Sequence, residues 1–192
     1  MRFWKARRMG FSAFPATAAW RHQGLRDGFE VVHFHRLGDG WRFTGCTTAV
    51  EEGQTWIVGY TITVDAKWAT RRAEVRGHSA TRVLEADGAG RWTVDGAYVP
   101  ELDGCLDVDL ESSAVTNTLP VHRLALADGA TAEAPAAYVR ARDLGVTTLA
   151  QTYRADGLSY DYRAPAFDFE CRLSYDESGL VLDYPGIAVR AA

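Results

Sequence analysis

Hydrophobic and polar residues alternate with a period of two in several segments of this chain, and that pattern constrains its fold more than any other feature. Successive side chains of a β-strand point to opposite faces of a sheet, so the pattern predicts strands with one buried face. In segment 56–64 the residues on one face are Trp56, Val58, Tyr60, Ile62 and Val64. In segment 167–175 they are Phe167, Phe169, Cys171, Leu173 and Tyr175. Shorter alternating segments are 29–36, 41–44, 106–110 and 158–163.

Pairs of Asp and Gly separate the alternating segments. Asp tolerates left-handed backbone angles and Gly adopts them freely, so such pairs between strands predict hairpins. The turn signals are Gly38-Asp39-Gly40, Asp87-Gly88, Asp95-Gly96, Asp128-Gly129 and Asp156-Gly157. Helix signals are few, and we expect at most one or two short helices. The predicted fold class is therefore mostly β, that is, β-rich α+β.

Length and charge exclude several classes of protein. The 192 residues carry a net charge of −4, and a chain of this length builds one domain with a core that needs no disulfide or metal. The acidic balance excludes a general nucleic-acid binder, because such proteins neutralise phosphates with a dense basic surface. The sequence has no phosphate-binding loop, no dinucleotide-binding glycine motif and no nucleophile elbow, so we expect no cofactor.

The three cysteines are Cys46, Cys105 and Cys171, and they are widely spaced with no Cys-x-x-Cys pair. We expect free thiols in strands, which suits a reducing cytosol.

The beginning of the chain resembles a loose leader. A basic cluster from Arg2 to Arg8 precedes a modestly apolar stretch over residues 9–19, and we interpret residues 1–19 as a leader outside the fold, with Met9 as an alternative initiator. No run elsewhere approaches the about 20 apolar residues of a membrane helix. The sequence therefore predicts a cytoplasmic protein without an integral membrane segment.

The densest polar region is segment 104–110. On a strand, Asp107 and Asp109 share the face opposite Leu106, Val108 and Leu110. Two neighbouring carboxylates repel each other, and burial raises the pKa of at least one. In a functional site, such a pair serves acid/base chemistry or holds a hydroxyl-rich ligand. In the alternative interpretation, the two carboxylates lie on a solvated strand face or belong to a structural network of hydrogen bonds.

Segment 116–123 follows this strand after a short turn. A strand returning alongside would bring Asn117, His122 and Arg123 near the two aspartates, with Arg123 able to neutralise one carboxylate. Tyr160 and Tyr162 share a face of another strand, as the wall of a cavity would.

Two histidines occupy alternate positions, His33 and His35, so both could face one metal ion. No nearby spacing completes a recognisable ligand set, and we expect no metal there.

An ordered set of motifs resembles a bacterial family named putative glycolipid-binding, from about Trp20 to Arg190. The motifs are Val64-Asp-Ala-Lys-Trp68 with Thr70-Arg71, Arg91-Trp-Thr-Val-Asp-Gly96, Leu102-Asp-Gly-Cys-Leu-Asp-Val-Asp-Leu110, Thr116-Asn-Thr-Leu-Pro120 with His122-Arg-Leu124, Gln151-Thr-Tyr153 and Leu180-Val-Leu-Asp-Tyr-Pro-Gly186. The resemblance implies a spiral β-roll, barrel-like, in a single domain over residues 20–192. A faint repeat of His35-Arg36-Leu37 at His122-Arg123-Leu124 leaves open a fold of two related halves.

Two functions follow from the resemblance and the residues together. The favoured one is non-catalytic binding of a glycolipid or other amphipathic small molecule, with no catalytic residue. The alternative is a hydrolase-like enzyme that uses Asp107 or Asp109 as general base with His122 as partner. The candidate ligand-binding residues are Asp107, Asp109, Asn117, His122, Arg123, Tyr160 and Tyr162.

Overall fold

The computed structural model describes residues 10–192, so the first nine residues of the leader expected over residues 1–19, including the alternative initiator Met9, lie outside the described residues. The strands of the large sheet are β1 (Thr17–His22), β2 (Arg26–Leu37), β3 (Gly40–Glu51), β4 (Gln54–Val64), β5 (Thr70–Arg76), β6 (Thr81–Ala86), β7 (Trp92–Val94), β8 (Ala97–Tyr98), β10 (Thr131–Glu133), β13 (Thr152–Asp156), β14 (Ser159–Ala164), β15 (Phe169–Tyr175), β16 (Val181–Tyr184) and β17 (Ala188–Arg190). A smaller sheet contains β9 (Asp107–Leu110), β11 (Ala136–Val139) and β12 (Val146–Leu149). The helical elements are α1 (Thr118–Leu124) and the 3₁₀ turns η1 (Pro100–Leu102), η2 (Val115–Asn117) and η3 (Pro165–Phe167).

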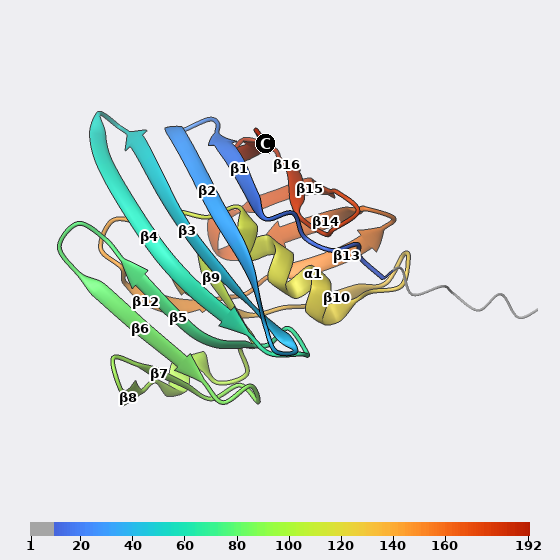
Figure 1. The fold of residues 1–192 in the computed structure, drawn as a ribbon, viewed down its shortest axis with the longest axis horizontal. Helices are drawn as coiled ribbons and strands as arrows, with labels where there is room; N and C mark the ends of the chain where they lie inside the picture. The colour runs from blue at the N-terminus through green and yellow to red at the C-terminus, as the bar shows by residue number, and fades with distance from the viewer. Residues whose placement is uncertain (1–9) are drawn as a thin grey trace, which may run out of the picture.

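The large sheet is antiparallel throughout and curves around α1 (Figure 1). Its strand order is β10-β13-β14-β15-β16-β17-β1-β2-β3-β4-β5-β6-β7-β8, so β10 and β8 are its edges. Near the middle, β1 pairs with β17, and the indole nitrogen of Trp20 donates to the carbonyl of Val181, 161 positions later, at 2.7 Å. These contacts join the early and late strands into one sheet.

The alternating pattern predicted the principal strands correctly. In β4, the side chains of Val58, Tyr60, Ile62 and Val64 are all buried. Hairpin turns lie at four of the five Asp-Gly signals, because the glycines there adopt positive φ, as Gly38 does between β2 and β3 at +56°. The prediction was wrong at Asp128-Gly129, which joins α1 to β10, a strand that pairs with β13. Over residues 10–192 the fold is mostly β with one short α-helix, which confirms the predicted class.

Two other local predictions were wrong. Phe167 does not continue the strand of Phe169, because Pro165 opens the turn η3 and leaves Phe167 exposed. The residues after Asn117 form α1 rather than a returning strand. Pro120 is compatible with this helix because it lies in the first turn, where a missing backbone N–H breaks no intrahelical bond.

The helix α1 packs between two halves of the core. Leu119 belongs to the hydrophobic cluster under β2–β7, while Val121 belongs to the cluster of tyrosines under β13–β15. The described fold also takes in part of the segment assigned to the leader, since β1 begins at Thr17 and Phe14 packs against the core.

All three cysteines lie in the described part of the chain and are free, as expected. Among residues 10–192, no helix has the length and hydropathy of a membrane-spanning segment.

Candidate functional site

A cavity of about 260 Å³ lies between the small sheet, the strands β14 and β15, and the turn between β1 and β2. Its polar lining residues include Asp109, Asn117 and Tyr138. Its apolar lining residues include Phe167 and Phe169. This combination of an apolar wall with a few polar groups is typical of sites for small molecules.

Asp109 is the buried carboxylate of the cavity. The hydroxyl of Thr116 donates to its Oδ1 at 2.8 Å, and the side-chain amide of Gln151 donates to its Oδ2. Burial raises the pKa of Asp109 to about 6, even though both of these bonds favour the charged form and so oppose the shift; the neighbouring Asp107 adds to it. With this pKa the carboxyl group is mostly ionised at pH 7.

Asn117 is fixed by tyrosines of β13 and β15. The Tyr153 hydroxyl donates to its side-chain oxygen at 2.8 Å, and the Tyr175 hydroxyl donates to its backbone carbonyl at 3.2 Å. The amide nitrogen of Asn117 then remains as a donor that has no hydrogen-bond partner within residues 10–192. Tyr162 also lines the cavity, where its hydroxyl accepts a hydrogen bond from the Gln151 amide at 3.1 Å.

Asp107 forms a buried ion pair beside the cavity. The guanidinium of Arg123, on α1, donates to both of its oxygens, with Nε at 3.0 Å from Oδ1 and Nη2 at 2.6 Å from Oδ2. Only 1% of the Asp107 side chain is exposed. Burial raises the pKa of Asp107, an effect that Arg123 opposes. The pairing with Arg123 agrees with the sequence prediction, but the pair ties α1 to β9 and does not line the cavity.

The sequence analysis missed Glu30, which is wholly buried on β2. Its carboxylate accepts hydrogen bonds from the hydroxyls of Tyr60 and Ser113 and from the backbone N–H of Ala114 at 2.8 Å. Burial raises the pKa of Glu30. Since Glu30 alternates in phase with the buried Val32, the period-two pattern itself carried the signal. The contacts anchor the segment that precedes Asn117.

His122 lies away from both aspartates. Its Nε2 is 2.9 Å from the carbonyl oxygen of Ser178, and its ring stacks on Trp68 with centroids 3.9 Å apart. Burial lowers the pKa of His122 to about 4, so the ring is neutral at pH 7. It lines a separate open hollow together with Trp41 and Trp68. The structure thus does not pair His122 with either carboxylate.

Tyr160 also faces elsewhere. It lines a third hollow, of about 250 Å³, beside Phe11. Of the seven candidate residues, the structure therefore brings three to the cavity: Asp109, Asn117 and Tyr162.

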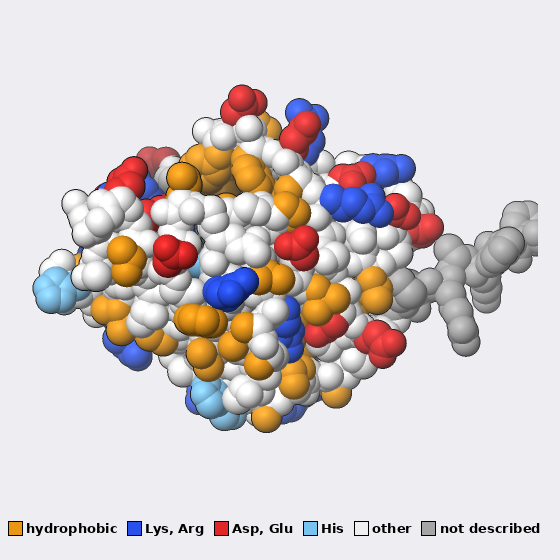
Figure 2. All heavy atoms as spheres, turned by 90° about the horizontal axis from the view of Figure 1, so that it is seen from above, with side chains coloured by type: hydrophobic (Ala, Val, Ile, Leu, Met, Phe, Trp, Pro, Cys, Tyr) orange, Lys and Arg blue, Asp and Glu red, His pale blue; other side chains and the backbone are white. Residues whose placement is uncertain are grey.

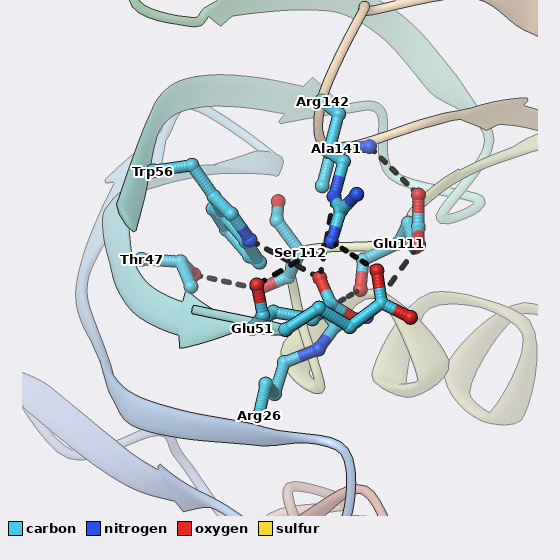
Figure 3. Close-up of polar contacts among 9 residues, drawn as sticks. Arg26, Thr47, Glu51, Trp56, Glu111, Ser112, Ala141 and Arg142 are labelled. Carbon is cyan, nitrogen blue, oxygen red and sulfur yellow. Dashed lines mark hydrogen bonds and ion pairs between the residues drawn. The ribbon is translucent and has the colours of Figure 1, made fainter. Parts of the chain in front are cut away.

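The network of charged groups in Figure 3 includes Arg26 and Glu111, which also line the cavity. Arg26 Nη1 donates to the carbonyl of Glu111 at 2.9 Å, and its Nη2 lies 3.5 Å from carboxylate oxygens of both Glu51 and Glu111. The indole of Trp56 donates to Glu51 at 3.1 Å. Arg142 completes the network from the loop after β11, at 3.8 Å from Glu51. These contacts hold the start of β2, where Leu25 and Arg26 line the cavity.

His33 and His35 lie on the exposed face of β2, with parallel rings whose centroids are 6.5 Å apart. Within residues 10–192, no group of three His, Cys, Asp or Glu residues is arranged to hold a metal ion.

Comparison with known proteins identifies the fold and the family. A DUF1089 family protein from Pseudomonas aeruginosa has 35% sequence identity and a TM-score of 0.74, over 92% of this chain and 96% of that one. A β-barrel-like protein of the domain of unknown function DUF1849 from Brucella abortus has 13% identity and a TM-score of 0.52, over 94% and 96% of the two chains, and shows a likeness of fold alone. No curated protein sequence matches the chain. The sequence model of the family described as "Putative glycolipid-binding" matches residues 17–190, and the chain belongs to that family.

Proposed function

We propose that the protein binds an amphipathic small molecule, a glycolipid or a similarly built metabolite, in the cavity of Asp109. The observation that carries this proposal is that buried polar side chains and aromatic side chains line the same cavity. Hydroxyl groups of a ligand would accept from the Asn117 amide and donate to the Asp109 carboxylate. The alkyl part would lie against Phe167 and Phe169, where it leaves water.

The size of the cavity sets how much of the ligand it encloses. About 260 Å³ is below the range of roughly 300–1,000 Å³ typical of pockets that enclose a drug-sized ligand. We therefore propose that the cavity takes a polar head with the first part of its apolar chain, while the remainder lies at the mouth.

The hydrolase alternative lacks the arrangement on which it depends. Asp107 is held by Arg123, and the Nε2 atom of His122 is engaged with the backbone of Ser178. We therefore propose the binding function alone. Because the three cysteines are free, we further propose that the protein resides in a reducing compartment.

The test uses octyl glucoside below its micelle concentration, with binding measured by calorimetry. Asp109→Asn retains the shape of the side chain but removes the charge that accepts ligand hydroxyls. We expect at least ten-fold weaker binding, whereas His33→Gln on the exposed face of β2 should bind as the wild type does. Equal affinity of the Asp109 variant and the wild type would exclude this carboxylate from the site, and no binding by the wild type would contradict the proposed head-group class.

A further inference from the structure

Two strongly exposed apolar side chains border the mouth of the cavity. Leu25, between β1 and β2, is 85% exposed, and Phe167, in η3, is 54% exposed. Both also line the cavity of Asp109, beside the partly buried Phe169 and Ile187. Figure 2 views the molecule from above relative to Figure 1, and it shows hydrophobic side chains interspersed with charged ones on the face in view. We call these four side chains the rim.

The rim is held by tight turns. Gly24 has φ of +71°, and a Cβ atom there would lie 2.5 Å from the carbonyl oxygen of Gly186, so the turns before β2 and before β17 touch. Phe167 precedes Asp168, whose φ of +47° reverses the chain into β15. The two apolar side chains are thus presented to solvent by fixed backbone, which lowers the entropic cost of burying them against a partner.

The charges around the rim indicate the kind of surface it fits. Arg163 is paired with Glu170 at 3.3 Å, and Arg26 is engaged in the network with Glu51 and Glu111. The exposed carboxylates of Asp27 and Asp168 flank Leu25 and Phe167. The rim therefore has no excess of positive charge with which to attract an anionic lipid surface.

The small apolar area of the rim suits a bilayer better than a protein partner. Of its four side chains, Leu25 and Phe167 are strongly exposed, whereas a stable protein–protein interface is centred on a larger apolar core. A lipid bilayer can bind so small an apolar surface, because each apolar side chain that enters the bilayer contributes separately.

We infer that Leu25 and Phe167 insert into the surface of a neutral, zwitterionic lipid bilayer and hold the mouth of the cavity against it. This inference rests on the proposed function, since it supplies the path by which an amphipathic ligand passes between bilayer and cavity. It names the partner as a lipid surface rather than another protein.

A second apolar surface provides a matched control. Phe29 and Ile57 are 50% and 48% exposed. Both pair with Thr48, so they point to the same face of the large sheet. They are as apolar as the rim, but neither lines the cavity of Asp109.

The experiment measures co-sedimentation of the full chain with sucrose-loaded phosphatidylcholine vesicles. We expect Leu25→Ser combined with Phe167→Ser to reduce partitioning at least ten-fold, while Phe29→Ser combined with Ile57→Ser leaves it within two-fold. Vesicles containing phosphatidylglycerol should bind no more strongly. The inference is wrong if the wild type does not partition, if the rim variant partitions normally, or if the control variant is the one that loses binding. Capture by a purified protein that depends on the rim, without vesicle binding, would make the partner a protein.

One further measurement separates this inference from the proposed function. Asp109→Asn should lose glucoside binding and retain vesicle binding. Failure of glucoside binding by the wild type contradicts the function of the cavity, and failure of the rim variants to affect partitioning contradicts only the lipid surface.

Discussion

At the scale of single residues, Asp109 makes the stability of the protein depend on pH. Its pKa rises from 3.8 to about 6 on burial, so between these values the folded chain retains a proton that the unfolded chain has released. Raising the pH then favours unfolding, and the stabilising contribution present below about pH 4 is lost as the pH passes through 6. The loss amounts to about 3 kcal/mol, from a shift of about two pH units at 1.36 kcal/mol each.

We therefore expect the stability of the wild type relative to Asp109→Asn to fall by about 2 kcal/mol between pH 4 and pH 7, because the unfolded chain is already partly ionised at pH 4. Urea denaturation of both proteins at each pH measures this difference. The comparison is needed because burial lowers the pKa of His22 and of His122 to about 4, and these groups change stability in the opposite direction. Asp39→Asn, in the exposed turn after β2, is the control and should follow the wild type. A constant difference across the range would contradict the shift.

Asp107 should behave as a structural residue although it lies two positions away. Asp107→Asn leaves the largely buried guanidinium of Arg123 without its charged partner, and breaking such a pair costs about 3 kcal/mol. Denaturant unfolding should show this loss, with glucoside binding unchanged in the protein that remains folded. Glu170→Gln removes the exposed ion pair with Arg163 and should change stability far less. If the Asp107 variant is as stable as the Glu170 variant, the ion pair does not hold α1.

The period of two was enough to place Asp107 and Asp109 on a common face, but their different roles depended on partners remote in sequence. Gln151 reaches Asp109 from across the fold, 42 positions later. Nothing local distinguishes a carboxylate that will meet an arginine from one that will border a cavity. Glu30 is the opposite case, because its position in phase with Val32 already marked it as buried.

At the scale of elements, the glycines of neighbouring strands differ in what surrounds them. A Cβ atom on Gly45 would lie 2.3 Å from Cζ of Tyr60, the residue directly opposite on β4, whereas at Gly59 it would meet only the carbonyl of Gly45 at 4.0 Å. The close approach at Gly45 leaves room for the Tyr60 ring, whose hydroxyl donates to Glu30. The absence of a side chain at Gly45 is therefore part of the support for the segment before Asn117.

Gly45→Ala should lower the free energy of unfolding by about 2 kcal/mol, because the buried ring of Tyr60 has to shift. Gly59→Ala should leave it unchanged or slightly raised, since alanine loses less backbone entropy than glycine on folding. Thermal and urea unfolding of the two variants provide the measurement. Equal destabilisation would show that backbone conformation, not the Tyr60 ring, determines the cost.

The elements that sequence reasoning placed correctly are those whose pattern is local. Strand β4 and the hairpin turns need only alternation and glycine, and both are visible in the chain. The end of the strand at Phe169 and the helix after Asn117 depend on packing instead: α1 forms where Leu119 and Val121 face two different cores. Short segments rarely reveal such a choice in isolation, because tertiary contacts outweigh intrinsic propensity.

At the scale of the whole molecule, the predicted β-rich single fold is confirmed, while the pairing that positions the cavity was not foreseeable. Strand β9, which contains Asp107 and Asp109, belongs to the small sheet and not to the large one. It pairs in parallel with β11, which lies far along the chain. Parallel pairs need a long connection, so no turn signal identifies them. The suggestion that the fold consists of two related halves stays a prediction.

The pairing of β1 with β17 has a consequence for how the chain reaches this structure. The hairpins from β2 to β6 pair neighbours in sequence, so they close short loops and can form early. The junction at Trp20 and Val181 closes only when segments 161 positions apart meet, which is the slow kind of contact in folding kinetics. Until then each half presents an unpaired strand edge to other chains, and that edge is covered when β17 pairs with β1. We expect this slow pairing to be a step that protects the protein from aggregation.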